Sequence, residues 1–188
     1  MDFTKLYSIY DEDLKGALYI QPKNQFDHYK IFRGELELIF PIIFYPNIGK
    51  KAYDLVGSGY AGLNLFSSKI INMLKENKIT GWKTYPCEIY DWDNNKLEGY
   101  SIFSVTGRCS AIDYSKSEKF IKQPYSPKGR PVNALRGLYF ESGSWDESDI
   151  FTPEDSMFSI VTEKVKELFE ENKITNIKFE RITGIEIL

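Results

Sequence analysis

The 188-residue sequence has little of several residue types on which whole classes of function depend. His28 is its single histidine, so a catalytic dyad or a histidine-ligated metal site would have to be built around one ring. Cys87 and Cys109 lack the spacing of a zinc site, and we interpret both as reduced thiols of a reducing compartment. We therefore expect no metal site, no cofactor and no catalytic residues.

The sequence also lacks a long hydrophobic run. The longest apolar stretch, from Leu38 to Tyr45, is interrupted by Pro41, whereas a membrane-spanning helix needs about 20 apolar residues. The first residues, Met1 to Lys5, have no apolar core of a secretory signal. A net charge of −3 and a pI near 5.4 give little attraction to nucleic acid. We expect a cytoplasmic protein with no membrane or nucleic-acid partner.

Large side chains, in contrast, are plentiful. Hydrophobic residues make up 42% of the chain and aromatic residues 15%, which is enough for a packed interior. The length fits a single domain over residues 1–188. The alternative is two half-units that share a core.

One stretch occurs twice. Residues 66–83 (the first copy) align without a gap with residues 161–178 (the second copy), at an offset of 95 (161 minus 66). Seven positions are identical, including the run Glu-Asn-Lys-Ile-Thr that starts at Glu76 and again at Glu171. The two half-units, if they exist, would be built on these copies.

Each copy has the pattern of a helix followed by a strand. Ser67 and Thr162 are suitable N-cap residues, and apolar residues then recur at the i, i+3 and i+4 positions of a helix. Asn77 and Asn172 suit helix ends, because asparagine tolerates a left-handed backbone. We predict an α+β fold: a mainly antiparallel sheet with two similar helices, at about 67–77 and 162–172, packed on it.

The stretch Gly57 to Gly62 reads G-x-G-x-x-G, the spacing of a dinucleotide site. In such a site the helix begins within the glycines, but here the expected cap, Ser67, comes five residues after Gly62. The matching residues of the second copy, Thr152 to Met157, contain no glycine. A flexible turn is the favoured interpretation, and a small-ligand or nucleotide site, with or without enzymatic activity, is the alternative.

Charge is unevenly distributed in the second half of the chain. Residues 114–136 look loop-like and carry six basic residues against one acidic residue, whereas residues 141–171 carry ten acidic and two basic residues. Aromatic residues lie among these acids, a combination typical of a protein-binding surface, although an acidic loop before a helix would look the same. The predicted partner-binding residues are Trp145, Asp146, Glu147, Asp149, Phe151, Glu154 and Asp155.

Three segments resemble the immunity proteins of bacterial polymorphic toxin systems, in particular the Myxococcus-type immunity family and its relatives. They are Tyr100 to Ser117 (YSIFSVTGRCSAIDYSKS), Asp149 to Phe151, and Ser159 to Phe179, which ends in KITNIKF. The KITGWKTYP of the first copy looks like the same signature. The chain departs from the family pattern at Asn176, where glycine is usual, and at Thr162, where serine is common.

The resemblance implies a small cytoplasmic protein that binds a cognate toxin and neutralises it by steric occlusion, without catalysis. The family carries no catalytic residue that could be transferred to this chain. A regulatory interaction module without a toxin partner would have the same sequence features. The sequence indicates no oligomeric state.

Overall fold

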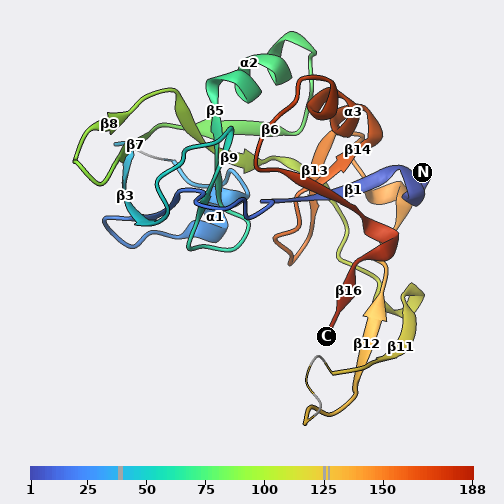
Figure 1. The fold of residues 1–188 in the computed structure, drawn as a ribbon. Helices are drawn as coiled ribbons and strands as arrows, with labels where there is room; N and C mark the ends of the chain where they lie inside the picture. Colours follow the sequence, from blue (N-terminus) through green and yellow to red (C-terminus); the bar gives the residue numbers. More distant parts are fainter. Residues whose placement is uncertain (38–39, 125, 127) are drawn as a thin grey trace.

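The computed structural model describes residues 1–37, 40–124, 126 and 128–188, so Leu38 and Ile39, at the start of the apolar run, lie outside the description. The described residues form sixteen mostly short strands in three sheets, three α-helices and four short 3-10 helices (Figure 1). The predicted α+β fold, a sheet covered by two helices, is therefore wrong. Helices do form near both expected places. The strand content was underestimated because most strands have only two to five residues, too few for an alternation of apolar and polar residues to be recognised in the sequence.

The helices and strands follow one another in three groups along the chain. The first is η1 (Phe3–Lys5), β1 (Leu6–Tyr10), β2 (Tyr19–Pro22), α1 (His28–Phe32), β3 (Ile42–Ile48), β4 (Leu55–Ser58), β5 (Asn64–Ser67) and α2 (Ser68–Glu76). The second is β6 (Trp82–Tyr85), β7 (Cys87–Tyr90), β8 (Lys96–Leu97), β9 (Tyr100–Val105), β10 (Gly107–Cys109), η2 (Tyr114–Lys116), β11 (Glu118–Lys122) and β12 (Val132–Arg136). The third is η3 (Ser142–Ser144), β13 (Ile150–Pro153), β14 (Ile160–Thr162), α3 (Glu163–Glu171), β15 (Lys178–Arg181), η4 (Ile182–Gly184) and β16 (Glu186–Ile187).

The similarity between the two copies extends beyond the matching letters. Residues 54–86 (the first unit) form β4, β5, α2 and β6, and residues 149–181 (the second unit) form β13, β14, α3 and β15. The two helices begin and end at positions that differ by 95, the offset of the sequence repeat. The same order of strand, strand, helix and strand is therefore present twice.

Each unit's sheet contains one strand from outside that unit, and we call these two strands the exchanged strands. β9 lies between β5 and β6 of the first unit, and β1 lies between β14 and β15 of the second unit. The registers correspond, because Phe66 pairs with Ser101 and its counterpart Val161 pairs with Tyr7. Each exchanged strand precedes one unit in the chain but belongs to the sheet of the other, so neither sheet is complete by itself.

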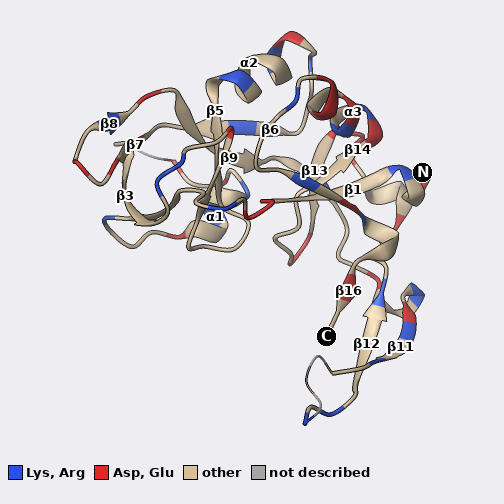
Figure 2. Ribbon diagram, viewed as in Figure 1, with Lys and Arg blue, Asp and Glu red and all other residues tan. Residues whose placement is uncertain are grey.

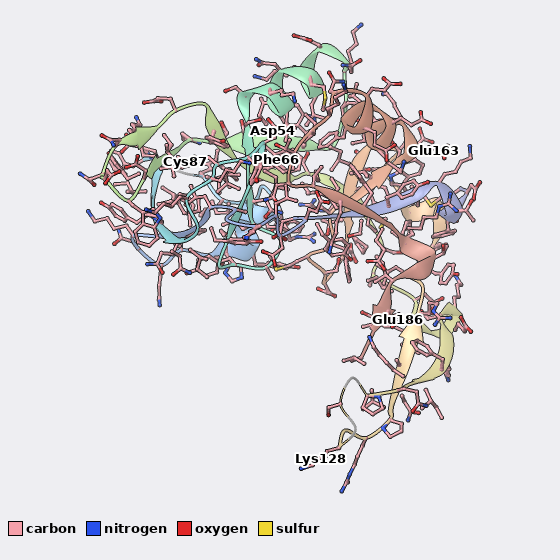
Figure 3. All side chains as sticks on the ribbon, in the orientation of Figure 1. Asp54, Phe66, Cys87, Lys128, Glu163 and Glu186 are labelled. Carbon is pink, nitrogen blue, oxygen red and sulfur yellow. The ribbon has the colours of Figure 1, made fainter. Side chains whose placement is uncertain are left out.

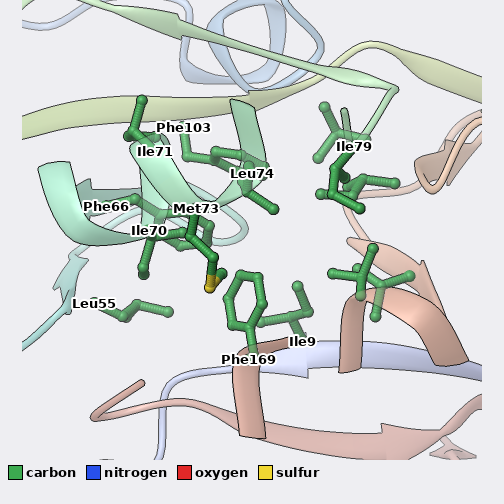
Figure 4. Close-up of a cluster of buried hydrophobic side chains, with 14 of the residues drawn as sticks. Ile9, Leu55, Phe66, Ile70, Ile71, Met73, Leu74, Ile79, Phe103 and Phe169 are labelled. Carbon is green, nitrogen blue, oxygen red and sulfur yellow. The ribbon is translucent and has the colours of Figure 1, made fainter. Parts of the chain in front are cut away.

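The largest hydrophobic cluster lies between the units. Figure 4 shows Phe169 of α3 and Ile9 of β1 facing Met73 of α2, with Phe66 nearby. The Phe66 ring lies 4.2 Å from that of Phe103 and 6.3 Å from that of Phe169, centroid to centroid. Side chains from both units thus fill one interior, which removes large apolar areas from water together.

Two aspartate–threonine pairs join the units reciprocally. The backbone N and Oγ1 of Thr175 donate hydrogen bonds of 3.0 and 2.9 Å to the carboxylate of Asp54. At the matching place, the N and Oγ1 of Thr80 donate bonds of 3.0 and 3.3 Å to the carboxylate of Asp149. Each aspartate N–H donates in return to the threonine Oγ1, at 3.1 and 3.0 Å. The Ile-Thr run that the copies share is therefore a joint between them.

A lysine of the same unit lies beside each aspartate. Lys69 Nζ is 3.5 Å from Asp54 and Lys164 Nζ is 3.3 Å from Asp149, and the two carboxylate side chains are 15% and 17% exposed. Burial raises the pKa of Asp54, but the hydrogen bonds from Thr175 and Ser67 and the charge of Lys69 outweigh it and hold that pKa below its ordinary value. The carboxylate is thus held in its charged form at the joint.

The two helix starts differ in one detail. Ser67 caps α2 as predicted, accepting from Ile70 N at 3.5 Å, whereas Thr162 stands at the N-cap of α3 without a side-chain capping bond. The Thr162 hydroxyl is buried and has no partner among the described residues. Glu163 in the first turn of α3 places a negative charge near the helix N-terminus instead.

Candidate interaction surfaces

The predicted acidic segment is not one continuous surface, because its aromatic residues point inward. Phe151 is fully buried in β13, with its ring 5.6 Å from that of Phe140. The half-buried Trp145 ring lies 5.4 Å from Phe151, and its Nε1 donates to the Ser148 carbonyl oxygen. Phe151 was predicted to contact a partner, and its burial rules this out. The prediction was wrong because a four-residue strand that is buried along its whole length has no alternation of apolar and polar residues to identify it.

Two of the predicted acids stabilise the fold. The Asp146 carboxylate accepts hydrogen bonds from Arg108 N at 2.8 Å and from Ser148 N at 3.1 Å, which fixes the loop against β10. Asp149 belongs to the joint between the units. Both carboxylates already accept hydrogen bonds within the fold, so their replacement would disturb the fold as well as any contact with a partner.

The other three acids, Glu147, Glu154 and Asp155, are exposed. Within the described part of the chain, their side chains form no hydrogen bond or ion pair. Glu147 and Asp155 have positive φ angles of 65° and 56°, so both stand at the tips of turns. An exposed carboxylate on a turn keeps its hydration and its field, and it can attract a basic partner.

A pocket of about 510 Å³ lies where the exchanged strand β1 leaves the second unit. Its wall contains the whole stretch Gly57 to Gly62, which is the turn from β4 to β5. The other walls come from the end of β1 and from Met157 to Ser159 in the turn between β13 and β14. Gly62 has a φ of +71°, and a Cβ there would lie 3.1 Å from the Met157 carbonyl oxygen, so glycine permits the close approach of the two turns.

The ionisable side chains that line this pocket are a carboxylate and phenols. The Tyr19 hydroxyl donates to the Asp11 carboxylate and lies 3.2 Å from Asp13. Burial and then these carboxylates raise the pKa of Tyr19 well above its ordinary value. Among the described residues that line the pocket there is no lysine or arginine. The pocket therefore suits an apolar or cationic group, and a phosphate would meet the charge of Asp11.

The glycine stretch lacks the geometry of a dinucleotide site. It connects two antiparallel strands, and α2 begins only after β5, so the helix that follows does not start within the glycines as it would in a dinucleotide site. The described residues that line its acidic pocket also include no lysine or arginine to pair with a nucleotide's phosphates. The site is a hairpin turn in the pocket wall.

The two cysteines and the single histidine do not form a common site. Burial raises the pKa of the thiols of Cys87 and Cys109 to about 12, so both are protonated at neutral pH. The ring of His28 stacks on Tyr60, with 4.6 Å between centroids. Within the described ranges, no three His, Cys, Asp or Glu side chains are grouped as metal ligands would be, and no helix is long and apolar enough to cross a membrane.

The basic segment that looked like a loop is largely a β-hairpin, except that Tyr125 and Pro127 lie outside the described residues. Strands β11 and β12 pair over five residues each, and β16 adds a third strand. Figure 1 shows this small sheet projecting from the rest of the molecule, and Figure 2 shows basic residues along it and at its tip. The run Lys119 to Lys122 holds two lysines around two apolar residues, a signal that could have identified an edge strand.

Comparison with known families gives a match over almost the whole chain. The model described as "Immunity protein family (Imm11)" matches residues 11–184. The matched range includes both units, the exchanged strand β9 and the projecting hairpin, and it begins directly after the exchanged strand β1. No curated protein matches the sequence.

Proposed function

The chain belongs to the immunity protein family Imm11, and on that premise we propose that it binds a cognate protein toxin and neutralises it by covering the toxin's working surface. The sequence resemblance to immunity proteins is confirmed by the family match, and this match is the observation that carries the proposal. Toxin binding as such follows from membership. Occlusion, and the surface that achieves it, are the proposed parts.

A rigid scaffold supports occlusion as the mechanism. The units share one core and are joined by buried side chains and by reciprocal hydrogen bonds. Such a scaffold presents preformed loops, and preformed surfaces lose less conformational entropy on binding. A non-catalytic inhibitor needs shape and complementary charge, both of which exposed turns on this scaffold can provide.

We place one contact on the exposed acids of the predicted segment, Glu147, Glu154 and Asp155. The last of these stands two residues before Met157, which lines the 510 Å³ pocket. Asp11 lines the same pocket from the opposite strand. A basic or aromatic side chain of the toxin could enter the pocket, while the surrounding carboxylates increase the rate of association.

Charge reversal of the exposed acids tests this contact. We expect Glu147→Lys combined with Glu154→Lys to lower the association rate with the toxin domain encoded beside this chain's gene by about tenfold at low salt, and by less at high salt, because the acids act by electrostatic steering. Surface plasmon resonance at two salt concentrations measures both rates. Asp146 and Asp149 are left intact, since their loss would loosen the fold.

The matched control is Glu76→Lys combined with Glu171→Lys. These exposed acids occupy equivalent positions at the C-terminal ends of α2 and α3, where lysine is well tolerated. The control makes the same charge change away from the pocket, so its association rate should stay within about twofold of the wild type. Equal rates for the test variant and the wild type would exclude the acidic contact. A wild-type protein that neither binds the toxin domain nor protects cells from it would exclude neutralisation.

The alternative function is a small-ligand site at Gly57 to Gly62, and the pocket favours it because all six residues of the stretch line the pocket. Its chemistry points to an apolar or cationic ligand, because Asp11 is its charged group. A thermal shift measurement separates the candidates: a ligand that binds the folded state raises the melting temperature by mass action. A rise with cationic aromatic compounds, without any toxin binding, would favour this alternative.

A further inference from the structure

The sheet of β11, β12 and β16, which we call the hairpin sheet, is the most isolated part of the molecule. Figure 3 shows Lys128 at its far end, away from the body, and Glu186 at its base. The sheet joins the body through β16 and the segments that flank the hairpin. A segment placed in this way contributes little to the shared core, and its presence calls for a different explanation.

The charges on one face of the hairpin sheet are neutralised by one another. The Arg136 guanidinium lies 3.1 Å from Glu118 and 3.2 Å from Glu186, and it covers the Phe120 ring at 4.4 Å from the centroid. Lys122 Nζ lies 3.0 Å from Glu186. These groups occupy one face of the sheet, and their charges cancel locally.

Other positive charges of the hairpin sheet are uncompensated. Lys119 in β11, and Lys128 and Arg130 in the connection between β11 and β12, are exposed, and within the described residues none of them forms a hydrogen bond, an ion pair or a ring contact. The sheet therefore carries three free positive charges on an element that projects into solvent (Figure 2). Positive charges of this kind extend a field towards an acidic partner over about one Debye length, roughly 8–10 Å.

The face that carries Lys119 is otherwise mostly apolar. Cross-strand pairing places Lys119, Leu135 and Ile187 side by side, and Ile121 lies on the same face opposite Asn133. The Ile121 side chain is 62% exposed, and a shallow groove of about 570 Å³ runs along these residues. An exposed isoleucine next to free cations is the composition of an interface with an apolar centre and a charged rim.

We infer that this face and the tip of the hairpin dock on an acidic surface of the toxin that has an apolar patch within it. The inference rests on the proposed function and adds a second contact, of opposite charge to the acidic turns. The lysines along β11 discourage pairing of its free edge with another strand, so docking uses the face and the tip. The exposed apolar side chains and the net charge of −3 favour a protein over a polyanionic nucleic acid.

The test is a binding measurement with the toxin domain encoded beside this chain's gene. The variant combines Lys119→Glu, Lys128→Glu and Arg130→Glu. Its control combines Lys15→Glu, Lys23→Glu and Lys75→Glu, which change exposed lysines elsewhere on the described surface whose side chains form no hydrogen bond or ion pair with the described residues. We expect the hairpin variant to raise the Kd at least about tenfold and to reverse the weakening of binding by salt. The control should stay within about threefold of the wild type.

A second pair of variants tests the apolar part of the contact. Ile121→Asn should weaken binding severalfold, whereas Ile48→Asn, at a position with 63% exposure in β3, should leave the Kd unchanged. Both side chains are already largely in water, so neither change should lower the melting temperature appreciably. Circular dichroism on all variants verifies that the fold is retained.

The outcomes separate the two proposals. If the wild type binds and protects but the hairpin variants bind equally well, the docking inference is overturned and the proposed function stands. If the wild type does not bind the toxin domain, the docking inference and the proposed function are both excluded. If sedimentation shows that the wild type is a dimer and that the triple charge reversal dissociates it, the partner of this face is a second copy of the chain. If the wild type binds a duplex oligonucleotide and the variant does not, the partner is a nucleic acid. Either result overturns the inference.

Discussion

The first unit (residues 54–86) and the second unit (residues 149–181) have the same elements but different surroundings. The first is extended by β2, β3, β7 and β8 into a sheet of eight strands, whereas the second has β10 beside it and the hairpin sheet beyond. Both keep their joint aspartate and threonine. The repeated residues thus hold the molecule together, and the candidate interaction surfaces lie where the units differ.

The helices show the same contrast on a smaller scale. In α2 the buried residues are Ile70, Ile71, Met73 and Leu74, whereas in α3 they are Val165 and Phe169. The outer side of α3 is rich in acids (Figure 2). One large ring in α3 therefore has to fill space that several aliphatic side chains fill around α2, which makes the second unit more dependent on a single residue.

The largest effect is expected at that residue. Phe169→Ala should lower the free energy of unfolding by about 3–5 kcal/mol, because it leaves a cavity against Phe66 and Ile9. Urea denaturation followed by circular dichroism and by tryptophan fluorescence gives the value. We expect both probes to report a single coincident transition, since the cavity opens a core that both units share. Two separated transitions would instead show that the second unit unfolds alone.

An intermediate loss of stability is expected at the turn after each helix, where the first unit has Gly81 and the second has Asn176. Gly81 has a φ of +85°, and a Cβ there would overlap the Ile150 carbonyl oxygen. Its counterpart Asn176, at a φ of +60°, accommodates a side chain whose Nδ2 donates to the Leu55 carbonyl oxygen at 3.0 Å. We expect Gly81→Asn to cost about 1–3 kcal/mol by overpacking, measured as a lowered melting temperature.

The reverse exchange, Asn176→Gly, should also destabilise the protein, but for a different reason. It removes the bond to the Leu55 carbonyl and the bond that Asn176 Oδ1 accepts from Leu14 N, leaving buried groups without partners. A Gly81→Asn variant as stable as the wild type would mean that the two turns are interchangeable, and it would contradict the difference in packing that we describe between the units.

The smallest effect is expected at the joint. Asp54→Ala and Asp149→Ala should each cost about 1–2 kcal/mol, because each removes a largely buried carboxylate that accepts both hydrogen bonds of the partner threonine and pairs with a lysine. The pKa of Asp54 is depressed in the folded state, so its contribution is present above the ordinary pKa of 3.8 and is lost as the pH falls through the lower folded value.

The pH dependence gives a specific readout for this pair. The difference in stability between the wild type and Asp54→Ala should be constant from pH 7 to about pH 5 and should shrink below about pH 4, as the carboxylate is protonated. Urea titrations at pH 7, 5, 4 and 3 measure it. A difference that grows with acidity would contradict the charged carboxylate at the joint. Glu171→Ala, an exposed acid of α3, is the control.

Local patterns in the sequence identified several features correctly. The apolar spacing located α2 and α3 to within one residue, and Ser67 caps α2 as expected. The missing helix after Gly62 argued against a dinucleotide site, and the structure has a hairpin turn there. These features depend on residues a few positions apart, so their physical causes are visible in a short window of sequence.

The overall fold and much of the candidate site were not visible in this way. Most strands are too short for a period of two to show, so the sheet content was underestimated. Phe151 was assigned to the surface because it stands among acids, although β13 is buried along its length. The hairpin sheet looked like a loop, because Pro124, Gly129 and Pro131 lie between its strands β11 and β12, and these strands are stabilised by pairing with each other.

What the sequence determined by itself is the position of the two helices in the doubled unit: the Ser67 cap and the apolar stripes follow from local conformational preferences. What only the tertiary structure decided is how the two units fit together. Asp54 meets a threonine 121 residues away, and β1 and β9 each complete the sheet of the other unit. Such partners are selected by the packing of the whole chain, because a carboxylate or an unpaired strand edge has the same sequence whichever partner it finds.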